Sequence, residues 1–208
     1  MAQQPAPADP TKTENVSRDG VKPAEMPVKQ MQLSNALAQY GRVNKDPLSL
    51  IVAAQMRKGF DFKVVDRKPD GDASPATQGD TGPTVEGLLK EARELSKNDK
   101  TIVALADDVM ASASKGRVGG GQITLGAISA RTTHTYTMSF AGGRFAEVAA
   151  IGINTNNIIL EIEDQGGHRI CRDSDPAYCP FNPIWTGPFR VKVINTGGSG
   201  AVYRMETN

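Results

Sequence analysis

The sequence predicts an α+β protein in which amino-terminal helical hairpins are followed by a carboxy-terminal antiparallel β-sandwich of jelly-roll type. Apolar residues recur at helical spacing over 29–116. Beyond 119 they alternate with polar residues, and turn residues interrupt the alternation about every eight to twelve residues, which is typical of a sandwich. The spacing of apolar residues changes from helical to alternating at the glycine run 119–121. We therefore expect a helical region over 29–116 and a β-sandwich domain over 119–208.

Residues 1–28 have the composition of a disordered, Pro-rich leader. The segment contains five prolines among polar and charged residues, and too few large apolar side chains to form a core. Its first residues, Ala2 to Pro7 after Met1, resemble the start of a mature exported protein whose signal peptide is absent from this chain. The alternative is a cytosolic protein with a flexible amino terminus. The leader alone favours the exported protein only slightly.

Two helical hairpins are predicted, separated by a loop over 61–83 that is rich in Gly, Asp and Pro. In the first hairpin, Asp46 and Pro47 are residue types preferred at the cap and the first position of a second helix. In the second, the apolar residues of 85–95 form one stripe, and the Asn98–Asp99 pair can cap the next helix.

The only two cysteines, Cys171 and Cys179, predict a disulfide. They flank a segment rich in turn formers, and an even cysteine count in a Gly-rich, β-rich chain suits an oxidising compartment. The alternatives are two separate buried thiols, or half of a metal site that would need His134 or His168. The disulfide is the favoured interpretation, and it predicts an exported bacterial protein that is periplasmic or extracellular.

The carboxy-terminal region also resembles a known family in its strands. Gly187–Asn195 reads Gly-x-aromatic-x-Val-x-Val-x-Asn, and a Gly-rich turn and a strand bearing Tyr203 follow it. Upstream, Asn157–Gly167 is an apolar strand that ends in Asp-x-Gly-Gly, and Gly126–Phe140 has the pattern of a first hairpin. In these features the chain resembles the bacterial pre-peptidase C-terminal domain, a small secreted β-sandwich. The resemblance covers less than half of the chain and leaves out the helical region.

The resemblance implies an accessory module of the kind appended to secreted hydrolases, some of which bind calcium or matrix polymers. The family's acidic positions before the long strand are Asn154, Asn156 and Asn157 here, and neutral amides attract a hard cation less strongly. The carboxylates that remain for a Ca²⁺ site lie in predicted turns: Asp164, Asp173 and Asp175. The alternative is that these aspartates only form turns.

Charge and motifs argue against several functions. The net charge is +1, with Lys and Arg scattered among Asp and Glu, so we expect no nucleic acid and no anionic membrane as partner. The sequence contains no run of about eighteen apolar residues, so we expect no transmembrane segment. Both histidines fall in predicted strands, and neither a Gly-x-Ser-x-Gly nor a His-Glu-x-x-His motif occurs. We expect no enzyme activity and no cofactor other than the Ca²⁺ considered above.

The segment from Cys171 to Thr186 is the predicted binding region. Trp185, the only tryptophan, lies there in a Pro-containing loop, and exposed aromatic side chains on such loops often anchor partners. Packing across the open end of the sandwich is the alternative for Trp185. The predicted partner-binding residues are Tyr178, Phe181 and Trp185.

These observations predict a non-catalytic exported protein whose β-sandwich binds a protein or a glycan as an accessory module. The alternative is a structural subunit of a cell-envelope or extracellular assembly. Such a subunit would be held in its assembly through the helical region and the amino-terminal arm.

Overall fold

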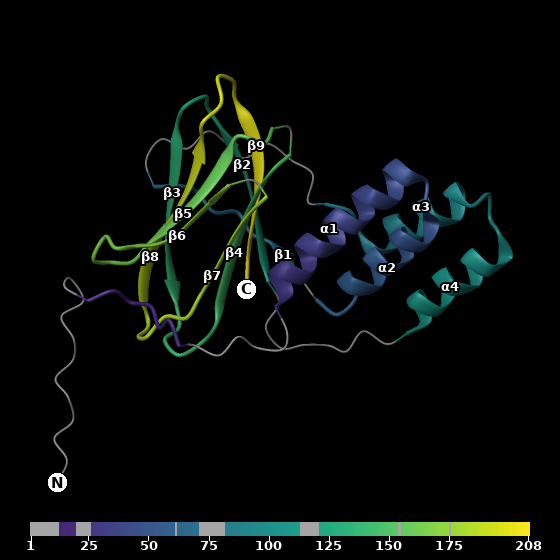
Figure 1. The fold of residues 1–208 in the computed structure, drawn as a ribbon, viewed down its shortest axis with the longest axis horizontal. Helices are drawn as coiled ribbons and strands as arrows, with labels where there is room; N and C mark the ends of the chain where they lie inside the picture. The colour runs from purple at the N-terminus through teal and green to yellow at the C-terminus, as the bar shows by residue number, and fades with distance from the viewer. Residues whose placement is uncertain are drawn as a thin grey trace, which may run out of the picture. The chain divides into compact units, whose positions relative to one another are not determined.

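A computed structural model of the chain describes residues 13–19, 26–60, 62–70, 82–112, 121–153, 155–174 and 176–208. The chain divides into two compact units, one helical and one built of β-strands (Figure 1). Among the described residues, the β unit takes 13–19, 66–70 and 124–205, and most of the rest forms the helical unit. None of the described helices is long and apolar enough to cross a bilayer.

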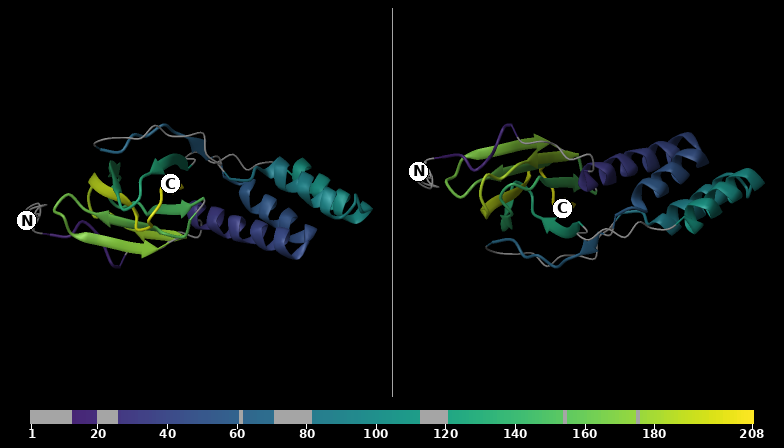
Figure 2. Two further views of the ribbon diagram at one scale, coloured as in Figure 1. Left: turned by 90° about the horizontal axis from the view of Figure 1, so that it is seen from above. Right: turned by 90° about the horizontal axis from the view of Figure 1, so that it is seen from below.

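The helical unit consists of two hairpins. Its helices are α1 (Pro27–Asn44), α2 (Pro47–Arg57), α3 (Val85–Leu95) and α4 (Lys100–Ala111). Asp46 caps α2 as the sequence predicts, because its carboxylate accepts a hydrogen bond from Leu48 N. Asp99 caps α4 in the same way, by accepting hydrogen bonds from the first backbone N–H groups of that helix. The two hairpins lie side by side in both views of Figure 2.

Apolar residues from all four helices form the core of the helical unit. They include Leu50, Ile51, Leu88, Leu89, Ile102 and Val109. Gly41 lies inside α1, where α1 packs against α2. A side chain at Gly41 would lie 3.1 Å from Leu50, so the glycine allows α1 and α2 to approach closely.

The β unit is a jelly roll, which confirms the predicted fold class. Its strands are β2 (Gln122–Ile128), β3 (Thr133–Phe140), β4 (Ala146–Gly152), β5 (Ile158–Glu163), β6 (Arg169–Ser174), β7 (Ala177–Phe181), β8 (Gly187–Asn195) and β9 (Ala201–Thr207). One sheet has the order β2-β9-β4-β7, extended at the β2 edge by the short parallel strand β1 (Lys63–Val64), and the other has the order β3-β8-β5-β6. Strands that follow one another mostly alternate between the two sheets, as in a double Greek key.

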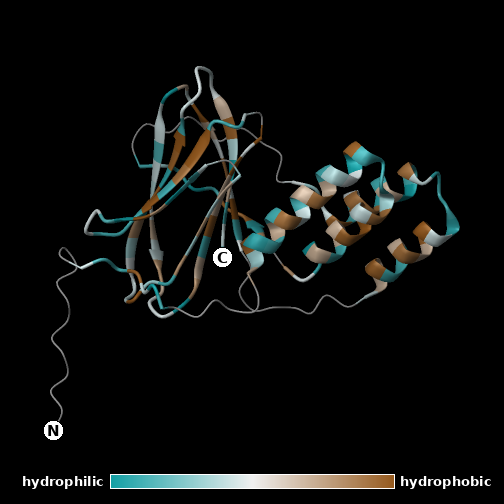
Figure 3. Ribbon diagram, viewed as in Figure 1, coloured by the Kyte–Doolittle hydropathy of each residue, from teal (hydrophilic) through white to brown (hydrophobic). Residues whose placement is uncertain are grey.

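The alternation seen in the sequence sorts side chains between the core and the outer faces of the sandwich. From the four-stranded sheet, Tyr136 and Met138 of β3 and Phe189 of β8 point inward and are buried. Phe140, Phe181 and Phe189 form a cluster in which the Phe181 ring centroid lies 5.1 Å from each of the other two. Figure 3 shows apolar stretches of the sandwich in brown and the β5–β6 hairpin tip as hydrophilic.

Two regions differ from the sequence-based expectation. Ala177–Phe181 forms strand β7, although the predicted binding loop included it. Pro180 obscured this strand, since proline suits only an edge strand, and β7 does lie at the edge of its sheet. Residues 13–19, assigned to the disordered leader, are ordered on the sandwich through the buried Asn15. Residues 1–12 and 20–25 lie outside the described part of the chain, as does the predicted boundary at 116–119.

Candidate functional site

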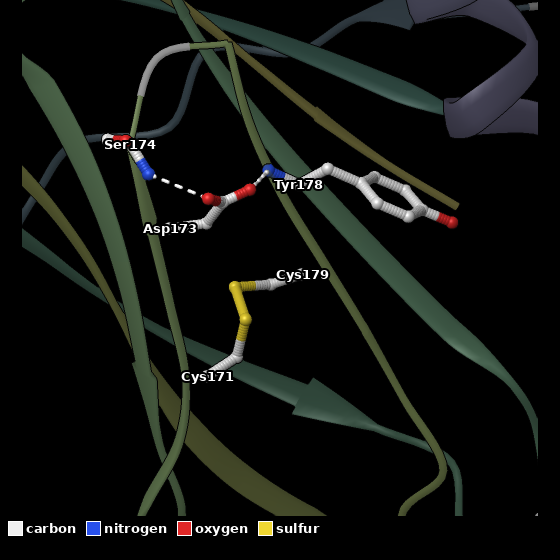
Figure 4. Close-up of a disulfide and its surroundings, with 5 residues drawn as sticks. All are labelled: Cys171, Asp173, Ser174, Tyr178 and Cys179. Atoms are coloured by element: carbon white, nitrogen blue, oxygen red, sulfur yellow. Dashed lines mark hydrogen bonds between the residues drawn. A yellow bond between two sulfur atoms is a disulfide. The ribbon is translucent and has the colours of Figure 1, made fainter.

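The predicted disulfide between Cys171 and Cys179 is present, with the two Cα atoms 5.8 Å apart (Figure 4). Cys171 lies in β6 and Cys179 in β7, and these strands belong to different sheets. The bridge therefore links the two sheets where each of them ends in an edge strand. A disulfide fits an exported protein, because thiols in the cytosol are normally kept reduced.

Asp173 shapes the turn beside the disulfide. Its carboxylate accepts hydrogen bonds from the backbone N–H groups of Ser174 and Tyr178, each at 2.9 Å (Figure 4). The alternative interpretation of this aspartate, a turn former, is the one that the structure supports.

The predicted Ca²⁺ site is not assembled from the aspartates that the structure describes. Asp164 follows β5, whereas Asp173 pairs with Leu160, four residues earlier on the same strand. Four residues of strand separate the two carboxylates by roughly 13 Å, too far for one ion to bind both. The prediction that Asp164 and Asp173 share a metal is therefore wrong, and Asp175 lies outside the described residues. No group of three potential metal ligands occurs within the described part of the chain.

Of the three predicted partner-binding residues, Phe181 is a core residue. Its side chain is buried in the phenylalanine cluster, because Ala177, Cys179 and Phe181 occupy the inward positions of β7. The prediction that Phe181 contacts a partner is therefore wrong.

Tyr178 points to the other face of β7 and is half-buried. Its hydroxyl donates a hydrogen bond to the buried Glu147 of β4 at 2.7 Å. Burial raises the pKa of Tyr178, and the adjacent Glu147 carboxylate raises it further, so the hydroxyl keeps its proton. Tyr178 thus links two strands of one sheet.

Trp185 lies in the loop 182–186 between β7 and β8, which we call the clamped loop. Within it, Ile184 is 50% exposed, Trp185 is half-buried and Thr186 is exposed. The loop therefore presents an apolar surface formed by two adjacent residues at one end of the sandwich. Ile184 was not among the predicted site residues, although its place beside Trp185 in a Pro-containing loop was visible in the sequence.

The buried side chain of Asn15 holds the clamped loop from one side. Its Oδ1 accepts hydrogen bonds from the backbone N–H groups of Ile184 and Trp185, both at 3.0 Å, and its Nδ2 donates to the Trp185 carbonyl at 3.0 Å. Ser17 N donates to the Asn182 carbonyl at 2.9 Å. In Figure 1 this amino-terminal segment, in purple, runs beside the end of the sandwich that carries the loop.

The turn between β3 and β4 holds the loop from a second side. Gly143 N donates to the Pro183 carbonyl at 2.7 Å, and Gly142 N donates to the Thr186 hydroxyl at 2.9 Å. A side chain at Gly142 would come within 2.6 Å of the Trp185 Cα, so only glycine allows this close approach. The loop backbone is thus fixed by hydrogen bonds from both neighbouring segments.

Asp164 anchors the segment that carries Asn15. Its buried carboxylate accepts hydrogen bonds from Asn15 N and His168 N, both at 2.9 Å, and contacts His168 Nδ1 at 3.0 Å. Burial alone would raise the pKa of Asp164, but the hydrogen bonds from Asn15 and His168 outweigh it and lower the pKa. The carboxylate therefore stays charged at neutral pH and serves as a structural anchor.

The other histidine lies in the core of the sandwich. His134 Nδ1 and the Tyr203 hydroxyl are hydrogen-bonded at 2.9 Å, and the Tyr136 hydroxyl lies 2.5 Å from that of Tyr203. All three side chains are buried, and burial lowers the pKa of His134, so its imidazole is neutral. His134 therefore has a structural role in the core of the sandwich.

No protein-family model matches the chain, and no curated protein sequence matches it. Several solved structures resemble part of it. The mitogen of Yersinia pseudotuberculosis has 14% identity over 44% of this chain and 86% of its own, with a TM-score of 0.38. A periplasmic inhibitor of g-type lysozyme from Aeromonas hydrophila has 11% identity over 42% of this chain and 84% of its own, with a TM-score of 0.36. Similarity of this extent carries no information on function, and the resemblance to the pre-peptidase C-terminal domain stays a prediction.

Proposed function

We propose that the chain is an exported, non-catalytic binding protein whose β-sandwich presents the clamped loop to a protein partner. The observation that carries the proposal is the rigid display of an apolar surface. Asn15 is fully buried and makes three hydrogen bonds to the loop backbone, while the neighbouring Ile184 side chain is half exposed. A loop that is already ordered loses little conformational entropy when a partner binds it.

The chemistry of the loop suits a protein surface as the partner. Ile184 and Trp185 offer adjacent aliphatic and aromatic groups, and such side chains commonly dominate the energy of protein interfaces. The half-buried Trp185 has its backbone N–H and carbonyl paired with Asn15, so a partner would contact this residue through its side chain. The disulfide supports export, and the structural roles of both histidines support a protein without catalytic activity.

Photo-crosslinking of the full chain in its native host tests this proposal. A photoreactive residue at position 184 should give a discrete protein adduct, and the additional substitution Trp185→Ala should remove most of it. The control places the same residue at Met110, an apolar position of α4 that is exposed to a similar extent as Ile184. Equal adducts from positions 184 and 110, or no adduct from 184, would contradict the proposal.

A structural subunit is the second candidate, and the exposed faces of α1 and α2 favour it. Leu33 and Tyr40 are exposed on α1, one helical repeat of seven residues apart, and Leu48 and Val52 are exposed four residues apart on α2. The described part of the amino-terminal arm packs on the chain's own sandwich. In this candidate function, the contacts with other subunits would therefore be made by the helices. Light scattering of the full chain should then show an oligomer that Leu33→Glu and Val52→Glu dissociate.

A further inference from the structure

The outer face of the four-stranded sheet carries charged residues in two rows that cross the strands. In one row Arg172 of β6, Glu161 of β5, Lys192 of β8 and Thr135 of β3 lie in register. In the next row the corresponding residues are Arg169, Glu163, Arg190 and Thr137. We refer to Arg169, Arg172, Arg190 and Lys192 as the cationic face.

The two glutamates of β5 hold these cations in place. Glu161 accepts from Arg172 Nη1 at 2.5 Å and from Lys192 Nζ at 3.4 Å. Glu163 accepts from Arg190 Nε at 3.2 Å and also from Lys192 Nζ. The hydrogen bond from Lys192, with help from Arg190, lowers the pKa of Glu163 despite its burial, so the Glu163 carboxylate is charged at neutral pH.

The carboxylates lie below the cations on this face. The side chains of Glu161 and Glu163 are 11% and 16% exposed, whereas those of the four cations range from 24% for Lys192 to 64% for Arg169. A ligand that approaches the sheet therefore meets guanidinium and ammonium groups first. Each arginine has N–H donors beyond those used by the glutamates, because a guanidinium carries five.

The face has more positive than negative charge. Four cations against two carboxylates leave an excess of two positive charges. At the β3 edge, the Asp70 carboxylate accepts a hydrogen bond from the Thr137 hydroxyl, so the excess lies over β6, β5 and β8. Cations on β6 and β8 are two strands apart, which is about 9 to 10 Å, and the two rows are about 7 Å apart along the strands. Such a grid matches several anions along an extended chain better than a single ion.

We propose that the cationic face binds an acidic polysaccharide, a chain of sugars that carries carboxylate or sulfate groups. Arginine pairs with both groups through two parallel hydrogen bonds, and the threonine hydroxyls at the end of each row can bond to sugar hydroxyls. The adjacent outward pair Ile159 and Ile194 provides an apolar surface for the C–H face of a sugar ring. The two rows contain no aromatic side chain on which a nucleotide base could stack, which argues against single-stranded nucleic acid.

This site is separate from the clamped loop, so the proposal does not depend on the protein partner. The test measures binding of the full chain to a sulfated polysaccharide and to polygalacturonate by calorimetry at low salt. Replacing Arg172 and Arg190 by Gln should weaken binding by roughly tenfold or more, because charged hydrogen bonds are lost. Lys90→Gln, at an exposed lysine of α3, should leave the affinity unchanged.

A second variant distinguishes a specific loss of polysaccharide binding from a loss caused by misfolding. Glu161→Gln raises the positive excess from two to three, so it should tighten binding and steepen its dependence on salt. Absence of binding to both polysaccharides at low salt, or unchanged affinity in the Arg172→Gln, Arg190→Gln variant, would overturn the proposal. Tighter binding to single-stranded DNA or to vesicles of anionic phospholipid would overturn it as well.

Discussion

The two units of this protein are stabilised over very different distances along the chain. In the helical unit, Asp46 caps α2 through a residue two positions away, and Ser34 of α1 bonds to the Ala53 carbonyl of the next helix. In the β unit, Asn15 bonds to Trp185 across 170 residues. The helical unit therefore depends on many local contacts, whereas the end of the sandwich depends on a few long-range ones. Single substitutions should have larger effects on the sandwich.

The two units can be followed separately in one unfolding experiment. Trp185 is the only tryptophan and lies in the β unit, so its fluorescence reports on the sandwich. Helical circular dichroism at 222 nm reports mainly on α1 to α4, since no α-helix occurs in the described part of the β unit. The four predictions below use both signals.

Removing the disulfide should have the largest effect. The bridge spans a sequence separation of 8, and closing a loop of that size stabilises a fold by roughly 2 to 3 kcal/mol. The variant Cys171→Ala, Cys179→Ala should lower the free energy of unfolding of the sandwich by this amount in urea, with no shift in the helical transition. Reduction of the wild type should reproduce the shift, and the same reductant should leave the variant unchanged.

Replacing Asn15 by Ala should have the next largest effect. It leaves two partly buried N–H groups and one carbonyl of the clamped loop without their partner, at a cost on the order of 2 kcal/mol. The sandwich transition should shift, and amide hydrogen exchange at Ile184 and Trp185 should accelerate. Asn44→Ala is the matched control, because Asn44 is exposed and donates only to the Tyr40 carbonyl. If exchange at Ile184 and Trp185 stayed as slow as in the control, Asn15 would not be what fixes the loop.

The same difference in distance explains what the sequence could and could not predict. The caps at Asp46 and Asp99 and the alternation in β3 are local signals, and the structure confirms them. The role of Asn15 depends on residues about 170 positions away, and nothing near Asn15 in the sequence indicates it. The composition of the leader predicted disorder instead. Composition cannot show that Asn15 becomes ordered through its contact with the clamped loop.

The candidate sites also differ in whether they depend on local or on long-range contacts. Cys171 and Cys179 were predictable because they are close in sequence and few in number. The burial of Phe181 was missed because Pro180 hid the strand whose alternation turns this ring inward. The cationic face was missed because its rows appear only when β5, β6 and β8 are placed in register. In the sequence its cations look like ordinary scattered surface charge.

Replacing Asp46 by Ala should destabilise the helical unit by about 1 kcal/mol, the usual value of an N-cap. Asp46 accepts hydrogen bonds from Leu48 N and the Ser49 hydroxyl, and both are lost. The transition at 222 nm should shift to lower urea concentration, while the Trp185 fluorescence transition should not. A shift of both transitions would show that the two units unfold together. It would contradict the view that the helical unit and the sandwich are stabilised separately, one by local and the other by long-range contacts.

The smallest predicted effect is a pH dependence confined to the sandwich. Burial lowers the pKa of His134, so the folded state holds a neutral imidazole while the unfolded state takes up a proton below its pKa of about 6.5. Stability should therefore be full above pH 7 and should fall as the pH drops through 6.5, by less than about 1 kcal/mol at pH 6.

His134→Gln should remove this pH-dependent component of the stability, so the difference between wild type and variant separates the effect of His134 from any effect of His168. Both histidines lie in the β unit, so the helical transition should stay constant between pH 7 and pH 6. If the wild type and His134→Gln lost the same stability between pH 7 and pH 6, the folded state would take up a proton at His134 as readily as the unfolded state, and the core would not hold the imidazole neutral.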